Sequence, residues 1–187
     1  MYIGGKLWLA KLDFEGYTES GTPIILAVGN RFSSAAPQLD IRAEFELTTE
    51  QKYSESECDE EDYAISCGKA TAKVKWTAMA NGFANLRINE IVSPYFGLGV
   101  GATAHEIKGD ISASGTGYIA NISNTLSDTT FTYQVMLGVA ITPTHNFSID
   151  LGYKYADYGK VSASDDYVEY EYKIKSSGVY FGANYIF

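Results

Sequence analysis

The sequence lacks any apolar run of about 18 residues, the length that a transmembrane helix requires. It is also short of positive charge, because 14 Lys and Arg stand against 23 Asp and Glu and give a formal net charge of -9. Nucleic-acid binding is therefore not expected, since phosphates require a basic surface. No basic and apolar leader precedes Tyr2, so we expect a secretory signal to be absent from this chain.

Only two histidines and two cysteines are present among 187 residues. Neither histidine belongs to a compact group with serine and acidic residues, so we expect no enzymatic activity, no metal and no cofactor. The 15 Tyr, 18 Gly and 4 Pro suit an all-β protein with tight turns. No break in composition divides the chain, which predicts a single domain over residues 1–187.

Alternation of apolar and polar residues is the main pattern of the sequence. It is clearest from Leu39 to Thr48, where every second residue is apolar and the intervening positions are Asp40, Arg42, Glu44, Glu46 and Thr48. Eight segments share this period and predict strands near residues 2–9, 24–32, 39–48, 72–78, 95–105, 131–139, 147–155 and 170–187. A change of parity in the last segment predicts a β-bulge near Ser176 and Ser177.

Two kinds of barrel show this alternation: a soluble lipocalin-type barrel with an apolar cavity, and a transmembrane barrel with an apolar outer face. Aromatic residues at strand ends, and glycines on the polar face such as Gly97, Gly99 and Gly101, favour the transmembrane barrel. We therefore predict an eight-stranded antiparallel up-and-down transmembrane β-barrel. Its four long outer loops would be residues 15–22, 49–69, 107–130 and 156–168, with both termini on the opposite side.

Several stretches resemble the opacity-protein family and the neighbouring small barrels of the OmpA and OmpX type. They are residues 41–46, 93–101, 134–139 and 150–155, together with the terminal Phe187. The resemblance implies eight antiparallel strands in the bacterial outer membrane and loops that bind a host-cell receptor or extracellular matrix. It also implies that alternate residues of the last strand, among them Phe181, Tyr185 and Phe187, form a signal recognised during membrane insertion.

Charged residues on the polar strand faces are predicted to fill the interior, because eight strands enclose a space that side chains just fill. Buried charges persist when they are paired, so we interpret this set as a structural plug. A gated pore lined by the same charges is the alternative. The predicted lumen network comprises Arg42, Glu44, Glu46, Lys73, Lys75, Asp150 and Lys154.

Cys58 and Cys67 bracket the acidic segment 59–62 in the second long loop. We predict a disulfide, since an oxidising periplasm permits one, and closing this loop would contribute about 2 to 3 kcal/mol. Two reduced cysteines are the alternative. The acidic residues could hold Ca²⁺ but lack EF-hand spacing, which favours a solvated acidic loop.

Tyrosines recur in the predicted outer loops, where they would offer contact area at low entropic cost. Those we predict for recognition are Tyr53, Tyr63, Tyr118, Tyr158 and Tyr167. The main hypothesis is a monomeric surface adhesin, surrounded by outer-membrane lipid, that binds its host partner through the loops. The alternatives are a small transport barrel for apolar solutes and, less favoured, a lipid-modifying enzyme with His105 or His145.

Overall fold

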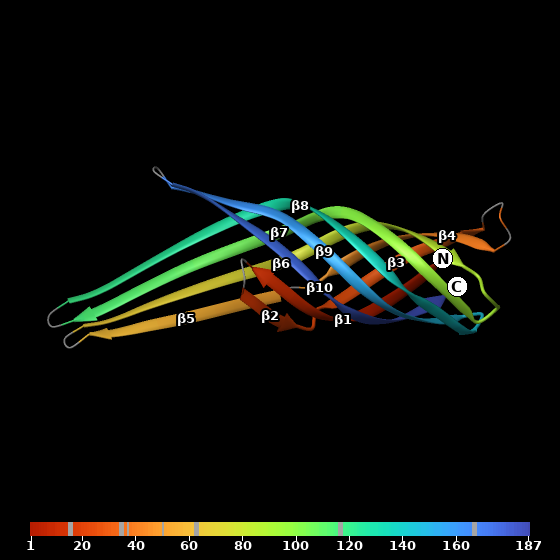
Figure 1. Ribbon diagram of the computed structural model, residues 1–187, viewed down its shortest axis with the longest axis horizontal. Helices are drawn as coiled ribbons and strands as arrows, with labels where there is room; N and C mark the ends of the chain where they lie inside the picture. Colours follow the sequence, from red (N-terminus) through yellow and green to blue (C-terminus); the bar gives the residue numbers. More distant parts are fainter. Residues whose placement is uncertain are drawn as a thin grey trace.

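The computed structural model describes residues 1–14, 17–33, 36, 38–49, 51–61, 64–115, 118–165 and 168–187. These residues form ten antiparallel strands (Figure 1). Their bounds are β1 Tyr2–Phe14, β2 Tyr17–Gly21, β3 Ile24–Ser33, β4 Leu39–Thr48, β5 Gln51–Glu61, β6 Ala64–Leu86, β7 Val92–Gly115, β8 Tyr118–Thr144, β9 Phe147–Asp165 and β10 Val168–Ile186. No helix long and apolar enough to cross a membrane occurs among them.

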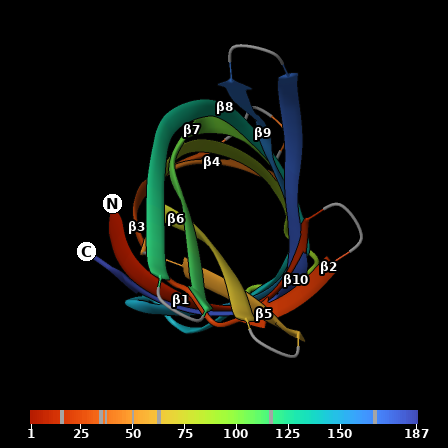
Figure 2. The same cartoon turned by 90° about the vertical axis from the view of Figure 1, so that its left-hand side faces the viewer.

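The ten strands occupy eight positions around a closed barrel, which confirms the predicted fold. β2 and β3 lie one above the other along β1, while β4 and β5 do the same along β6. β1 pairs with β10 from Tyr2–Ile186 to Phe14–Ile174 and closes the ring, as the view along the barrel shows (Figure 2). Closure leaves no unpaired sheet edge where the strands cross lipid.

Burial alternates along each strand and gives the barrel an apolar exterior. In β4, the lumen side carries Arg42, Glu44 and Glu46, all buried, while Phe45 and Leu47 face outward and are exposed. The other strands share this pattern, with outward residues that include Leu7, Leu26, Leu98, Leu137, Leu151 and Phe181. A continuous apolar band of this kind marks a surface that lies against lipid.

The stretches predicted as long loops are largely strands, so that part of the prediction is wrong. Residues 51–61 form β5, and residues 107–115 and 118–130 belong to β7 and β8. Antiparallel hairpins can continue beyond the membrane because their hydrogen bonds join backbone groups and do not require apolar side chains. Figure 1 shows β5 to β8 extending together well past the remaining strands.

This extension separates from its neighbours on both sides. β8 pairs with β9 only up to Tyr133–Asp157. Farther from the chain termini, β8 pairs only with β7, and β9 pairs only with β10, in the part of the chain that the structure describes. No pairing joins β2 to β5 among the described residues. The outer part of the molecule therefore contains a four-stranded sheet, β5–β6–β7–β8, and a separate β9–β10 hairpin. We call the former the extracellular sheet, residues 51–61, 64–74, 105–115 and 118–132.

The predicted bulge at Ser176 and Ser177 is wrong in position. The register between β9 and β10 shifts between Lys173 and Lys175. Ile174, Ser176 and Tyr180 all face the lumen with the same parity. Apolar residues serve in the upper lumen as well as in lipid, so Ile174 gave a misleading signal of orientation.

Replacement of Leu137 by Arg tests the orientation of the strands. Leu137 lies outside the barrel between Phe96 and Tyr153, and a cation near the middle of the membrane should lower the free energy of unfolding by about 2 to 4 kcal/mol. Denaturant titration of the protein in lipid vesicles measures this free energy of unfolding. The matched control is Thr129→Arg, on the same strand but at the outer end of the apolar band, level with Ala104, which should cost less than about 1 kcal/mol. Equal losses would contradict the assigned orientation.

Candidate functional site

We call the half of the lumen nearer the chain termini the lower lumen and the other half the upper lumen. The lower lumen holds a network of buried charges. Lys6 Nζ on β1 forms ion pairs with two carboxylates of β4, bonding Glu44 and lying 2.6 Å from Glu46 Oε1. The second oxygen of Glu46 accepts hydrogen bonds from Gln134 at 2.8 Å and from Lys154 at 3.2 Å. These contacts tie β1, β4, β8 and β9 together across the interior.

A second pair crosses the lumen beside the first. Arg42 Nη1 donates to Asp150 Oδ2 at 2.8 Å, and Asn184 Nδ2 donates to the same oxygen at 3.2 Å. The Arg42 guanidinium carbon lies 4.0 Å from the centre of the Phe83 ring and 5.1 Å from that of Tyr95. Stacking on aromatic faces adds cation–π attraction in a site from which water is largely excluded.

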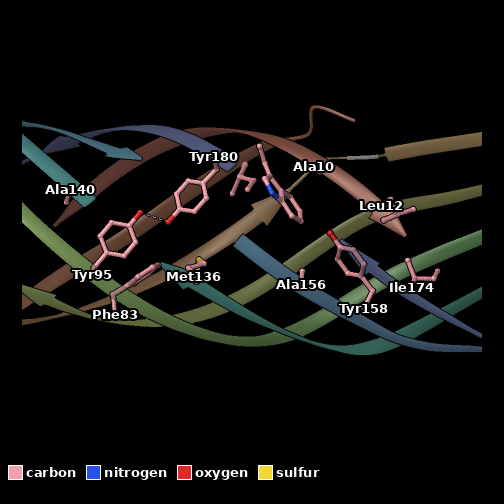
Figure 3. Packing of buried hydrophobic residues seen from close by; sticks show 12 residues of the cluster. Ala10, Leu12, Phe83, Tyr95, Met136, Ala140, Ala156, Tyr158, Ile174 and Tyr180 are labelled. Atoms are coloured by element: carbon pink, nitrogen blue, oxygen red, sulfur yellow. Dashed lines mark hydrogen bonds between the residues drawn. The ribbon is translucent and has the colours of Figure 1, made fainter. Parts of the chain in front are cut away.

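The network is electrically neutral, since Lys6, Arg42 and Lys154 balance Glu44, Glu46 and Asp150. Tyr2 donates a hydrogen bond to Glu44 at 2.6 Å, and the hydroxyls of Tyr95 and Tyr180 bond across the lumen (Figure 3). The five predicted residues 42, 44, 46, 150 and 154 thus lie together, surrounded by aromatic rings. The sequence could have indicated Tyr95 and Tyr180, because they occupy the same alternate positions of their strands as the inward polar residues. Phe83 could not be found in this way, since it follows the strand predicted at residues 72–78.

Lys73 and Lys75, which the sequence placed in the lumen, belong on the outer side of the barrel. The register between β6 and β7 shifts between Val74 and Trp76. This bulge turns Val74 into the lumen and leaves the Lys75 side chain 42% exposed, with its Nζ 2.5 Å from Glu106 Oε2. Lys73 pairs in register with Glu106, one step beyond the inward pair Val74–His105, so it faces outward as well.

The upper lumen is lined by apolar side chains together with buried threonines. Trp8, which is 1% exposed, belongs to one buried cluster with Ala10, Leu12, Ala156 and Ile174, and Figure 3 shows the last four of these inside the barrel. Tyr158 belongs to the same cluster and is 2% exposed, so it is not available to a partner and its predicted role in recognition is wrong. Buried side chains thus occupy both parts of the lumen, with charges in the lower part and apolar and polar groups in the upper part.

His105, one of the two histidines considered for catalysis, lies in this upper lumen. His105 Nε2 is 2.9 Å from Thr130 Oγ1, and its ring packs edge-on against Tyr158. Ser112, a serine seven residues further along β7, is exposed and donates weakly to the Cys67 carbonyl at 3.4 Å. Within the described part of the chain, no three His, Cys, Asp or Glu side chains converge as metal ligands would.

The extracellular sheet contains the disulfide predicted from the sequence. Cys58 of β5 and Cys67 of β6 are directly opposite in the register and are bonded to each other. Tyr53 lies in β5 and Tyr118 begins β8, whereas Tyr63 and Tyr167 fall outside the described residues. The disulfide thus joins two strands of the sheet rather than closing a solvated loop.

The last strand places its alternate residues against lipid. Phe181, Tyr185 and Phe187 are exposed on the outer face, and the Tyr185 and Phe187 rings pack edge-on with centres 5.1 Å apart. The Phe187 amide donates to the Met1 carbonyl at 3.0 Å, which joins the two termini. Their part in membrane insertion stays a prediction.

Comparison with known sequences identifies the family. Residues 1–187 match the family described as outer membrane protein beta-barrel domain. The chain belongs to this family. It is a bacterial outer-membrane β-barrel, so its apolar exterior faces outer-membrane lipid and its charged interior is a lumen inside the membrane.

A solved structure of a neisserial outer-membrane barrel has the same fold. Neisserial surface protein A is 17% identical, with a TM-score of 0.55 and coverage of 100% of this chain and 96% of that one. Ail, the attachment invasion locus protein of Yersinia pestis, is 22% identical, with a TM-score of 0.45 and coverage of 98% and 94%. Sequence comparison finds no match among curated proteins.

The Arg42–Asp150 pair of this outer-membrane barrel provides a test of the plug. Arg42→Met or Asp150→Leu alone should each lower the free energy of unfolding by about 3 to 5 kcal/mol, because each leaves a buried charge unpaired. The double variant should lose less than the sum. Denaturant titrations of all four proteins in lipid vesicles give the coupling.

A half-exposed ion pair serves as the control for that cycle. Arg87 Nε lies 3.1 Å from Asp40 Oδ2 at the end of the barrel near the termini. Arg87→Met should cost less than about 1 kcal/mol, as exposed pairs usually do. Additive losses at Arg42 and Asp150 would contradict a coupled, desolvated pair.

The cross-strand disulfide should stabilise the extracellular sheet without affecting the membrane-spanning barrel. Trypsin leaves both cysteines in the peptide 53–69, so an intact bond should appear as the loss of two hydrogens and as resistance to alkylation. Cleavage after Glu61 should then give two peptides that separate only on reduction. The Cys58→Ser, Cys67→Ser variant should keep heat-modifiable mobility but digest faster within residues 51–74. Free thiols in protein folded under oxidising conditions would contradict the bond.

Proposed function

We propose that this barrel is a monomeric surface adhesin without enzymatic activity, and that the extracellular sheet binds a host-cell receptor or matrix protein. The observation that carries the proposal is the length of that sheet. Beyond Ala104, the register partner of the exposed Trp76, β7 continues to Gly115, about 35 Å at about 3.3 Å per residue. A barrel that served only as a membrane anchor would not need this extension.

The filled lumen supports a role on the outside. The Arg42–Asp150 pair and the network around Lys6 and Glu46 occupy the interior with side chains that bond to one another. Moving a solute through would break several buried charge pairs at once, and each break is costly. The lumen therefore suits a rigid support for the sheet better than a path for apolar solutes.

The edges of the extracellular sheet offer backbone groups to a partner. Over residues 118–132, β8 pairs with β7 on one side, and no described strand pairs with its other side. This edge carries a single charge between Tyr118 and Thr130, at Asp128. The opposite edge, β5, carries Glu55, Glu57, Asp59, Glu60 and Glu61. Charge usually protects an edge against strand addition, so we assign binding to the β8 side, with Tyr118 among its residues.

Shortening the sheet tests the proposal. Replacing residues 108–128 with a tight turn removes the outer parts of β7 and β8 but keeps every strand that crosses the membrane. The variant should retain heat-modifiable folding and lose binding to cultured epithelial cells and to a panel of immobilised matrix proteins. Binding by the full chain is measured in parallel after refolding in the same detergent.

Two matched variants decide where binding lies. Removal of residues 162–171 at the tip of the β9–β10 hairpin should leave binding unchanged, since that hairpin is separate from the sheet. The Arg42→Met, Asp150→Leu variant should also bind normally. If the sheet deletion binds as well as the full chain and the lumen variant instead changes solute flux across vesicles, the adhesin proposal must be replaced by transport.

A further inference from the structure

The β-bulge at Lys75 places two neighbouring side chains on the outside of the barrel. Val74 and Trp76 face opposite sides of the wall, and the register with β7 skips Lys75 between them. Lys75 and Trp76 are both exposed: the Lys75 side chain has 42% of its surface accessible, and the Trp76 residue also has 42%. Without the bulge, the alternation of β6 would send Lys75 into the lumen. Bulges of this kind commonly redirect a side chain towards a functional surface.

Lys75 lies in a small cluster of cations. Its Nζ is 2.5 Å from Glu106 Oε2, and Lys108 Nζ is 3.4 Å from the other oxygen of the same carboxylate. Lys73 is the cross-strand neighbour of Glu106. Lys75 and Lys108 share the single carboxylate of Glu106, so these three residues carry a net charge of +1 on a chain whose formal net charge is -9.

The shared glutamate holds the lysines without covering them. The Glu106 side chain is only 12% exposed, while the Lys108 side chain is 41% exposed. The Lys75 and Lys108 side chains are thus both held by the Glu106 carboxylate, with their ammonium groups on the outer face. This arrangement leaves N–H donors of two ammonium groups close together and available to an anion.

The cluster lies at the outer boundary of the membrane. Trp76 of β6 is exposed on the outer face and pairs in register with Ala104 of β7, and Trp side chains favour the level of lipid headgroups. Lys75 and Glu106 come directly above this pair. An anion bound here would therefore be in the headgroup layer of the outer leaflet, with its apolar part beside Trp76.

We propose that Lys73, Lys75 and Lys108 bind a phosphate group of the phosphorylated glycolipid of the outer leaflet, lipid A. Glu106 orients the two exposed ammonium groups, and Trp76 contacts the adjoining sugar and acyl chains. Ammonium groups near a headgroup layer attract anionic lipids, each by a several-fold factor in affinity. Lys73, Glu106 and Lys108 belong to the part of the extracellular sheet next to the membrane. The site does not depend on what the outer part of that sheet binds.

Native mass spectrometry of the refolded full chain in micelles tests the site. Equal amounts of bisphosphorylated lipid A and its fully dephosphorylated form are offered to the protein. The wild type should retain the phosphorylated form preferentially, and Lys75→Gln with Lys108→Gln should reduce that preference about tenfold. Glu106→Gln should increase it, because it removes the competing carboxylate.

A second pair of lysines provides a control with the same loss of charge. Lys160 and Lys173 are exposed register partners on the β9–β10 hairpin, and Lys160→Gln with Lys173→Gln should keep the wild-type preference. Inorganic phosphate alone, titrated against lipid-free protein, should bind at least tenfold more weakly. Equal retention of both lipids, an equal loss in the control, or tight binding of free phosphate would each overturn the proposal. Heat-modifiable mobility confirms that every variant is folded.

Discussion

The absence of water within the membrane is the constraint on which this structure depends. Every backbone N–H and C=O at that depth must bond to another strand, so β1 and β10 must meet and the chain must close. This ring closes with eight strand positions, and eight positions enclose an interior just large enough for side chains. The outward alternation and the filled lumen both follow from that single requirement.

Filling the lumen with charges follows from the same geometry. Side chains that cannot face lipid face inward, and there they must pair, as Arg42 does with Asp150 and Lys6 with Glu44 and Glu46. The aromatic rings of Phe83 and Tyr95 shield these pairs. The result is a rigid cylinder whose interior has little left to do, which leaves the functional variation to the surfaces outside the membrane.

Sequence reasoning succeeded where lipid imposes a pattern. The segment from Leu39 to Thr48 was predicted with the bounds that β4 has, because each outward residue had to be apolar. It failed above the membrane. Residues 51–61 look like a polar loop because neither face of β5 meets lipid, and pairing with β6 rather than alternation makes them a strand.

The bulge at Lys75 shows a different limit of the sequence. Ala72, Val74, Trp76 and Ala78 alternate without interruption, so nothing marks the change of face between Val74 and Trp76. An apolar residue fits the upper lumen as well as lipid, and only the pairing with β7 shows which environment it occupies. The sequence alone therefore does not show that Lys75 lies outside the barrel, and it does not show the candidate binding site there.

Amide hydrogen exchange of the folded protein in lipid vesicles tests the closed barrel most directly. The account predicts that residues 2–9 of β1 and 179–186 of β10 are protected as strongly as the membrane-level parts of β7 and β8, since they pair with each other across the seam. It also predicts faster exchange along the outer edge of β5. Rapid exchange of β1 and β10, as expected of two unpaired sheet edges, would contradict closure and the account that rests on it.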